Sequence, residues 1–365
     1  MQGDGIALRF GLANVLLVAG IASLLVGGWA IVLVAAVAML SGGPIDEVAG
    51  DDESMVGDAG RRFYAFNLYA TAPLIALLTI AFLYGVRQSA GATDGLGQAL
   101  PLVAAGFLVG YLYALVGVTV AHELTHWTHD RIAQESARIL LSFTFNTTFT
   151  IYHVHGHHRT VAQYNDAATA RRGEHVLAFI VRTVIWQFRE AVSYEAERLR
   201  RANQAVWSWH NRALIGQLYS FAIVVVAWGF AGLTGVLAFM SAALVGRIIH
   251  ELMNYVQHYG LVRVDGAAIE ARHTWDCYRR ISNALQYNLP RHSNHHLFAS
   301  KPFWDLPTSD KAPRLPHGYQ TMAMLALIAP LWRRTMRPLL ADWDRNHANE
   351  AERELIRQRG WDNLA

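Results

Sequence analysis

Residues 99–126 read ALPLVAAGFLVGYLYALVGVTVAHELTH, an apolar run that ends directly on His122-Glu-Leu-Thr-His126. Residues 99–121 are long enough to cross a bilayer as a helix, which takes about 20 apolar residues. His122 and His126 are separated by four positions, so they share one face of a helix and can hold one metal ion. The stretch therefore predicts a membrane helix that carries metal ligands to the membrane face.

Three further histidine motifs repeat this theme along the chain. They read His153-Val-His155-Gly-His157-His158, Asn254-Tyr-Val-Gln-His258-Tyr-Gly and His292-Ser-Asn-His295-His296. Histidine is the commonest side-chain ligand of transition metals. So many imidazoles at helical spacing exceed the need of one ion, and we expect two. Neutral imidazole suits iron, zinc and copper alike, so this pattern does not choose the metal.

The arrangement within these motifs leaves some roles open. His157 and His158 are adjacent and point about 100° apart on a helix, so they can serve different ions. His155 is interpreted as an outer partner, a residue that contacts a metal ligand, rather than as a ligand itself. His122-Glu123-x-x-His126 also resembles a zinc protease motif with Glu123 as general base. The larger histidine set argues against a protease, because such a zinc site needs only about three protein ligands.

Composition places the chain in a membrane. It is 53% hydrophobic and 16% charged, against about 25% charged in soluble proteins. Cys277 is the single cysteine, too few for an iron–sulfur cluster with its roughly four ligands, so any electrons must come from a separate protein. The excess positive charge is nearly all arginine, which we attribute to membrane topology rather than to nucleic-acid binding.

Hydropathy predicts six membrane-spanning helices in one domain that covers residues 1–365. The predicted spans are approximately 6–26, 28–40, 63–86, 99–121, 213–233 and 235–256. Residues 6–40 are either one very long helix or a hairpin that breaks at Gly27-Gly28. We prefer the hairpin, because it puts Arg9 on the side where the other arginines gather. Both readings are too long for a signal peptide.

The connecting segments give the orientation and the remaining elements. Segments 122–212 and 257–365 hold the histidines and most arginines, so the positive-inside rule makes them cytoplasmic, with both termini inside. Residues 137–152 are expected to form either a short helix or a membrane-dipping segment that delivers His153, and residues 175–200 an amphipathic helix on the membrane surface. The expected fold is an all-α integral membrane protein, a six-helix bundle of a bacterial-type inner membrane, with a cytoplasmic histidine site.

The motifs together resemble those of the membrane-bound alkane and xylene monooxygenases, histidine-rich non-haem di-iron enzymes related to fatty-acid desaturases. The likeness runs from about residue 60 to 345, and Asn-Tyr-x-x-His-Tyr-Gly is typical of the hydroxylase branch. The resemblance implies two iron ions, O2 as co-substrate, and rubredoxin or a [2Fe–2S] reductase as electron donor. The iron ligands that it implies are His122, His126, His153, His157, His158, His258, His292, His295 and His296.

The chain departs from the family pattern at two points that concern the substrate. Tyr152 stands where the family often has glutamate, and Gln163-Tyr-Asn-Asp166 lacks the two prolines typical of the alkane enzymes. A methyl-arene and a linear alkane are therefore both expected substrates, and each would reach the site from the lipid bilayer. A desaturase or decarboxylase with the same metal core is the alternative enzyme. A metal transporter fits less well, because it would place ionisable groups at the span centres.

Two sets of residues are candidates for supporting roles. Metal-bound histidines usually donate their second N–H to a carboxylate or carbonyl. The candidates for such outer partners are Glu123, Asp166, Glu251, Asn254, Glu270 and Asp276. Small and aromatic residues on the fourth span either line a substrate route or serve helix packing, namely Gly106, Phe107, Gly110, Tyr111, Tyr113 and Gly117.

Overall fold

The computed structural model describes residues 8–89 and 95–362. Residues 6 and 7 of the first predicted span and the last three residues of the chain lie outside this description. Within the described ranges the regular structure is helical, and only two isolated β-bridges occur, which confirms the all-α prediction. The helices are α2 (Leu12–Val26), α3 (Trp29–Ser41), α4 (Pro44–Ala49), α5 (Arg61–Ser89), α6 (Gly95–Leu112), α7 (Thr119–Thr125), α8 (Arg131–Ser142), α9 (Phe149–Tyr152), α10 (His158–Thr160), α11 (Val176–Arg201), α12 (Arg212–His258), α13 (Arg280–Leu285), α14 (His292–Leu297), α15 (Tyr319–Ala326), α16 (Ala329–Asn346) and α17 (Glu350–Gln358). Two π-helical turns, η3 (Tyr113–Val118) and η4 (His153–His157), interrupt this pattern.

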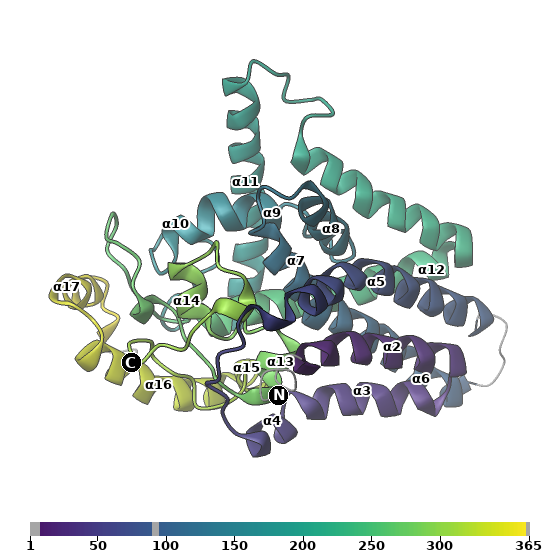
Figure 1. The fold of residues 1–365 in the computed structure, drawn as a ribbon, viewed down its shortest axis with the longest axis horizontal. Coiled ribbons are helices and arrows are strands. Elements are labelled where there is room, and N and C mark those ends of the chain that lie inside the picture. Colours follow the sequence, from purple (N-terminus) through teal and green to yellow (C-terminus); the bar gives the residue numbers. More distant parts are fainter. Residues whose placement is uncertain (1–7, 90–94, 363–365) are drawn as a thin grey trace.

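A glycine pair reverses the chain near its N-terminus. Gly27 and Gly28 have φ values of 80° and 56°, which side chains other than glycine rarely adopt. The chain therefore turns between α2 and α3 at the glycines that the hairpin interpretation requires. Helix α2 packs against α5, and α3 packs against α6, so these four helices lie side by side (Figure 1).

Four helical stretches in the described part of the chain are long and apolar enough to cross a bilayer. They are Arg9–Val26, Asp58–Ser89, Ala99–Thr125 and Arg212–His258, and Trp29–Ser41 is a shorter apolar helix. The backbone of α12 leaves helical geometry at Ala231 and Gly232. A β carbon added at Gly235 would lie 2.4 Å from the carbonyl oxygen of Ala227. The two halves of α12 therefore fold back on each other and make a second hairpin.

One glycine of the fourth predicted span, Gly110, has a packing role. A β carbon on Gly110 would meet the Ala242 carbonyl oxygen at 2.4 Å, and one on Gly246 would meet the Gly110 carbonyl oxygen at 3.0 Å. Helices α6 and α12 thus approach each other backbone to backbone, as small residues allow in membrane proteins. Gly110 is therefore a packing residue and not part of a substrate route.

The histidine-bearing elements gather at one end of this bundle. Figure 1 shows α7, α9, α10 and α14 meeting where α2, α3, α5 and α6 end, with α16 and α17 beyond them. Helix α11 runs steeply across the direction of the bundle helices (Figure 1). Its inner face buries Phe179 and Ala191, and its outer face exposes Val181 and Ile185, so the predicted amphipathic helix is present.

Candidate metal centre and its apolar cavity

All nine histidines implied as ligands come together at the end of the bundle. Within each of two groups, one ring nitrogen of every member lies within 4.8 Å of the others. The first group is His122, His126, His153 and His295, and the second is His157, His258, His292 and His296. His158 lies between the groups. Its Nε2 is 2.9 Å from Nε2 of His153, and its ring stacks on that of His296 with centroids 4.4 Å apart.

The ring nitrogens face one another rather than other hydrogen-bonding groups. The Nε2 atoms of His126 and His153 are 3.0 Å apart, and those of His258 and His292 are 3.1 Å apart. The Nε2 atoms of His292 and His296 are separated by 3.2 Å. A neutral imidazole has one N–H donor and one acceptor lone pair. Converging nitrogens at these distances present several lone pairs to a shared point, which is the arrangement that a metal cation satisfies.

Burial favours the neutral form of most of the site imidazoles. It lowers the pKa of His126 and of His292 to about 3, and neighbouring histidines push in the same direction. The same causes lower the pKa well below the ordinary value for His153, His158, His295 and His296. A desolvated imidazolium is unfavourable, and crowding several of them is worse. The rings are therefore ready to bind metal at neutral pH without first releasing a proton.

In two of the histidine pairs with a spacing of four residues both members lie in the same group, and in a third pair they do not. His122 and His126 lie in the same group, as their spacing on α7 predicts. His292 and His296 do so too. By contrast, His153 and His157 have the same spacing but lie in different groups, because η4 is a π-helical turn. Such a turn is wider than an α-helical one and is frequent at functional sites.

One of the predicted outer partners binds a site histidine directly. The Asp166 carboxylate accepts a hydrogen bond from Nδ1 of His157 at 2.9 Å, and from the hydroxyls of Tyr152 and Thr169 at 2.6 Å each. Burial would raise the pKa of Asp166, but His157 and the hydroxyl donors outweigh it and hold that pKa below its usual value. Bonding at Nδ1 fixes the His157 tautomer and leaves Nε2 free for a metal. Tyr152, where the family often has glutamate, thus supports the carboxylate that orients a ligand.

The other predicted outer partners bind elsewhere among the described residues. Asp276 holds the start of α14, because Ser293 donates to it through its amide at 2.6 Å and its hydroxyl at 2.7 Å. His155 is exposed and lies outside both groups. The remaining contacts are Glu123 with Trp127 Nε1 and the Phe303 amide, Asn254 with Glu251, and Glu270 with Arg272.

An apolar cavity of about 570 Å³ opens onto the histidines. Site histidines from both groups form part of its wall, namely His122, His153, His157 and His292. Most of the remaining wall is apolar and comes from α6, η3, α12 and α15, including Phe107 and Tyr111. Its volume is within the range of about 300–1,000 Å³ that is usual for small-molecule sites. Phe107 and Tyr111 therefore fit their predicted role of lining a route for the substrate.

The cavity also has polar groups, and its glutamines are residues that the sequence did not single out. Tyr111 donates its hydroxyl to the Gln320 side-chain oxygen at 2.7 Å, and the Gln320 amide donates to the Met39 carbonyl at 2.8 Å. Gln257 and Gln286 also line the cavity. Gln257 lies one residue before His258 and on the same buried end of α12. That proximity to a motif histidine was the only signal in the sequence that pointed to it.

The sequence of this chain is similar to those of known membrane monooxygenases and desaturases. The family described as "Fatty acid desaturase" matches residues 98–325, which include every histidine motif. Alkane 1-monooxygenase 1 of Pseudomonas aeruginosa is 34% identical over 85% of this chain and 82% of its own length. The xylene/toluene monooxygenase hydroxylase component of Pseudomonas putida is 28% identical over 82% of this chain and 81% of its own. Alkane 1-monooxygenase of Acinetobacter baylyi is 34% identical over 60% of this chain and 55% of its own. The chain therefore belongs to the family of membrane monooxygenases that contains the alkane 1-monooxygenases, within the fatty acid desaturase-like proteins.

Proposed function

We propose that this monooxygenase hydroxylates an unactivated C–H bond, either the terminal methyl of an alkane or the alkyl side chain of an arene. The reaction consumes one O2, two electrons and two protons, and yields the alcohol and water. The observation that carries the proposal is the juxtaposition of nine clustered histidines with an apolar cavity of about 570 Å³. An apolar substrate partitions into lipid and can bind such a cavity beside the metal centre.

The donor set fits two iron ions, since neutral imidazoles suit iron and their lone pairs converge on two points. When bound, the irons supply the activation of O2 that the side chains cannot perform. The chain holds the ions through the nine histidines, and Asp166 orients one of these rings through His157. The apolar walls exclude water and position the substrate C–H bond beside His122, His153 and His292.

The proposal includes a topology of six crossings in one domain of residues 1–365, with the histidine centre and both termini on the cytoplasmic side of a bacterial inner membrane. Two hairpins support it, one at Gly27–Gly28 and one at Ala231–Gly232. Segments 122–212 and 257–365 would then lie on the cytoplasmic side, where arginine is expected to gather.

We include a separate electron donor in the proposal, either rubredoxin or a [2Fe–2S] reductase. The single cysteine, Cys277, is buried and cannot carry a cluster alone. Arg61, Arg62 and Arg131 are exposed at the histidine end of the bundle. Such positive charges would attract an acidic redox protein and speed its encounter.

Product analysis under 18O2 tests the proposal. Membranes with this protein and a rubredoxin–reductase system would be given octane, dodecane, xylene and a fatty acid. We expect a terminal or benzylic alcohol that carries 18O, and its identity selects the substrate class. An alkene without 18O would instead establish the desaturase or decarboxylase reaction, which the fatty acid desaturase match makes the second candidate.

A further inference from the structure

A second cavity, of about 390 Å³, lies between α11, the second half of α12 and the segment that joins α8 to α9. Arg247 and Arg189 line it together with Thr148 and apolar side chains such as Phe145, Val184 and Phe188. We propose that this cavity binds the phosphate-bearing headgroup of an anionic phospholipid, held by Arg247 and Arg189, with its acyl chains along the exposed face of α11.

The first observation is an arginine with donors that nothing in the described chain satisfies. Nη2 of Arg247 lies 2.9 Å from the carboxylate of Glu251, whose side chain is fully buried. The Nε and Nη1 atoms of Arg247 are also buried, and they have no hydrogen-bond partner among the described residues. A buried, unsatisfied donor costs about 1–3 kcal/mol, and more when it is charged. An oxygen acceptor from outside the described chain would satisfy these donors of Arg247.

The charge of the cavity determines what kind of acceptor fits. Among the described residues no acidic side chain lines it, and Glu251 neutralises only one of its two arginines. Arg189 is exposed and has no ion pair with any described residue. The cavity thus has a net positive charge within apolar walls. Basic pockets between membrane helices are typical binding sites for anionic lipid headgroups.

The position of Arg247 along α12 agrees with a headgroup. It is about 22 Å from the bend at Gly232, at about 1.5 Å of rise per helical residue. The hydrocarbon core is about 30 Å thick, so Arg247 lies in the third of the core nearest the histidine side if the bend is at the opposite boundary. An arginine at this depth reaches headgroup oxygens by extending its side chain toward the interface.

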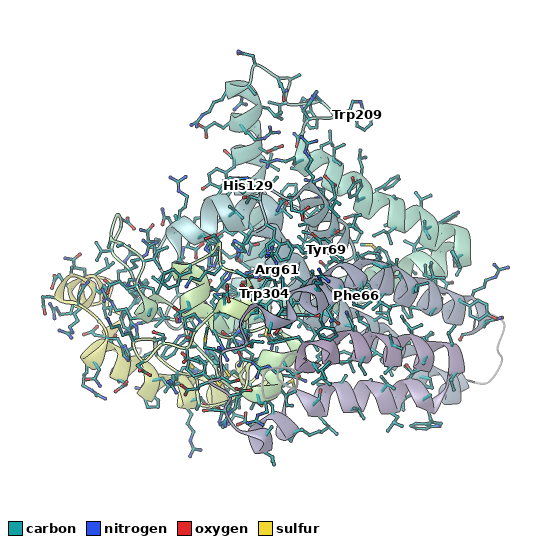
Figure 2. The ribbon with its side chains drawn as sticks, in the orientation of Figure 1. Arg61, Phe66, Tyr69, His129, Trp209 and Trp304 are labelled. Atoms are coloured by element: carbon teal, nitrogen blue, oxygen red, sulfur yellow. The ribbon has the colours of Figure 1, made fainter. Side chains whose placement is uncertain are left out.

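The outer face of α11 supplies the surface for acyl chains. Its exposed side chains recur every three or four residues at Leu177, Val181, Ile185, Phe188 and Val192. Two tryptophans follow in the loop before α12, Trp207 and Trp209, which are 85% and 80% exposed. Figure 2 shows Trp209 at the outer end of this loop. Tryptophan gathers at the interface between lipid and water, so this loop marks the headgroup level. The apolar face of α11 then reaches the acyl chains just below that level.

The test uses the full chain in nanodiscs of phosphatidylcholine, with or without about one third phosphatidylglycerol. Thermal unfolding gives stability, and native mass spectrometry counts retained lipids. We expect phosphatidylglycerol to raise the unfolding midpoint by several degrees and one such lipid to stay bound. The change Arg189→Gln should remove at least half of the shift. The control Arg200→Gln, an exposed residue of the same helix outside the cavity, should keep it.

A double variant tests the buried arginine without leaving a lone carboxylate. Arg247→Gln combined with Glu251→Gln should abolish both the shift and the retained lipid. Glycerol 3-phosphate in solution should leave the midpoint unchanged. Equal midpoints in both lipids, an equal loss in Arg200→Gln, or an equal shift with glycerol 3-phosphate would each overturn the proposal. None of these readouts depends on turnover, so they are separate from the proposed hydroxylation.

Discussion

The histidine centre and the arginine cavity are both polar regions inside an apolar bundle, and both use α12. His258 ends this helix, and Arg247 lies about three turns earlier. The histidine centre has converging lone pairs on neutral rings and a shortage of positive charge. The arginine cavity has buried N–H donors and a shortage of acceptors. The unmet hydrogen-bonding need thus indicates the sign of the missing partner, a cation in one region and an anion in the other.

Removing a central histidine should have the largest effect on the histidine centre. We expect His258→Ala to lose bound iron and to lower hydroxylation by more than about 100-fold, beyond the effect usual for an outer partner. The control is His155→Ala, which lies in η4 but is exposed and outside both groups. Metal analysis and product formation on the same preparation give the answer. Full iron content in His258→Ala would contradict the assignment of this residue as a ligand.

Removing the carboxylate that orients a metal ligand should lower metal affinity and activity less than removing the ligand itself. Asp166→Asn keeps the size of the side chain but removes the charge that orients His157. We expect metal affinity or activity to fall by about 10- to 100-fold, as is usual for such partners. Glu270→Gln is the matched control, since Glu270 pairs with Arg272 instead. Equal losses in both variants would show that Asp166 acts only on stability.

The cavity that opens onto the histidine centre should respond to volume in both directions. Ala114 and Leu115 are adjacent in η3 and both line it. Ala114→Leu should shift preference toward shorter substrates, and Leu115→Ala toward longer ones. Each displaced CH2 is worth about 0.8 kcal/mol, or about fourfold in relative kcat/KM. Competition between alkanes of different length measures the ratio. A shift in the same direction for both variants would exclude this cavity as the substrate site.

Lowering the pH should destabilise the metal-free protein through the histidine centre and not through the arginine cavity. This effect should be smaller than those of the substitutions above. Unfolded histidine takes up a proton near pH 6.5, whereas burial holds the pKa of His126 and of His292 at about 3. Between these values the unfolded state binds more protons, so stability falls as pH is lowered. For metal-free protein we expect the unfolding midpoint to drop by at least about 5 °C from pH 7.5 to 5.5.

The arginine region provides the control for this pH effect. Arg247→Gln with Glu251→Gln should show the same drop, because the titrating groups belong to the histidine centre. A midpoint that does not change with pH in the unsubstituted metal-free protein would contradict the burial of neutral histidines. Differential scanning calorimetry in one detergent at both pH values makes the measurement.

Much of this architecture could be predicted from hydropathy and spacing. The apolar run before His122 predicted its helix, and the glycine pair at Gly27 indicated the first hairpin. The grouping of His122 with His126 followed from the α-helical period. The separation of His153 from His157 did not follow, because nothing in the local residues distinguishes a π-helical turn from an α-helical one. Tertiary contacts decide that choice.

The outer partners were harder to predict for a related reason. Asp166, Glu123 and Glu270 are alike as carboxylates near motifs, and only the fold determines which one faces a site histidine. Asp166 does so because Tyr152 and Thr169 hold it from both sides. Arg247 lies within the predicted span 235–256, but the lack of partners for its side-chain donors depends on the packing of α11 against α12. Neither relation is present in the local sequence.

The π-helical turn η4 also bears on how this protein can change over evolutionary time. A π turn contains one more residue than the α-helical turn that it replaces. Deleting the exposed residue His155 would let the segment revert to an α-helix while every later side chain keeps nearly its present direction, because the α-helical turn needs one residue fewer. His157 and His158 would then stay at the centre, with one residue fewer between them and His153. This segment can thus lose one exposed residue while the ligands stay in place, whereas a single-codon deletion in a flanking α-helical turn would rotate the ligands by about 100°.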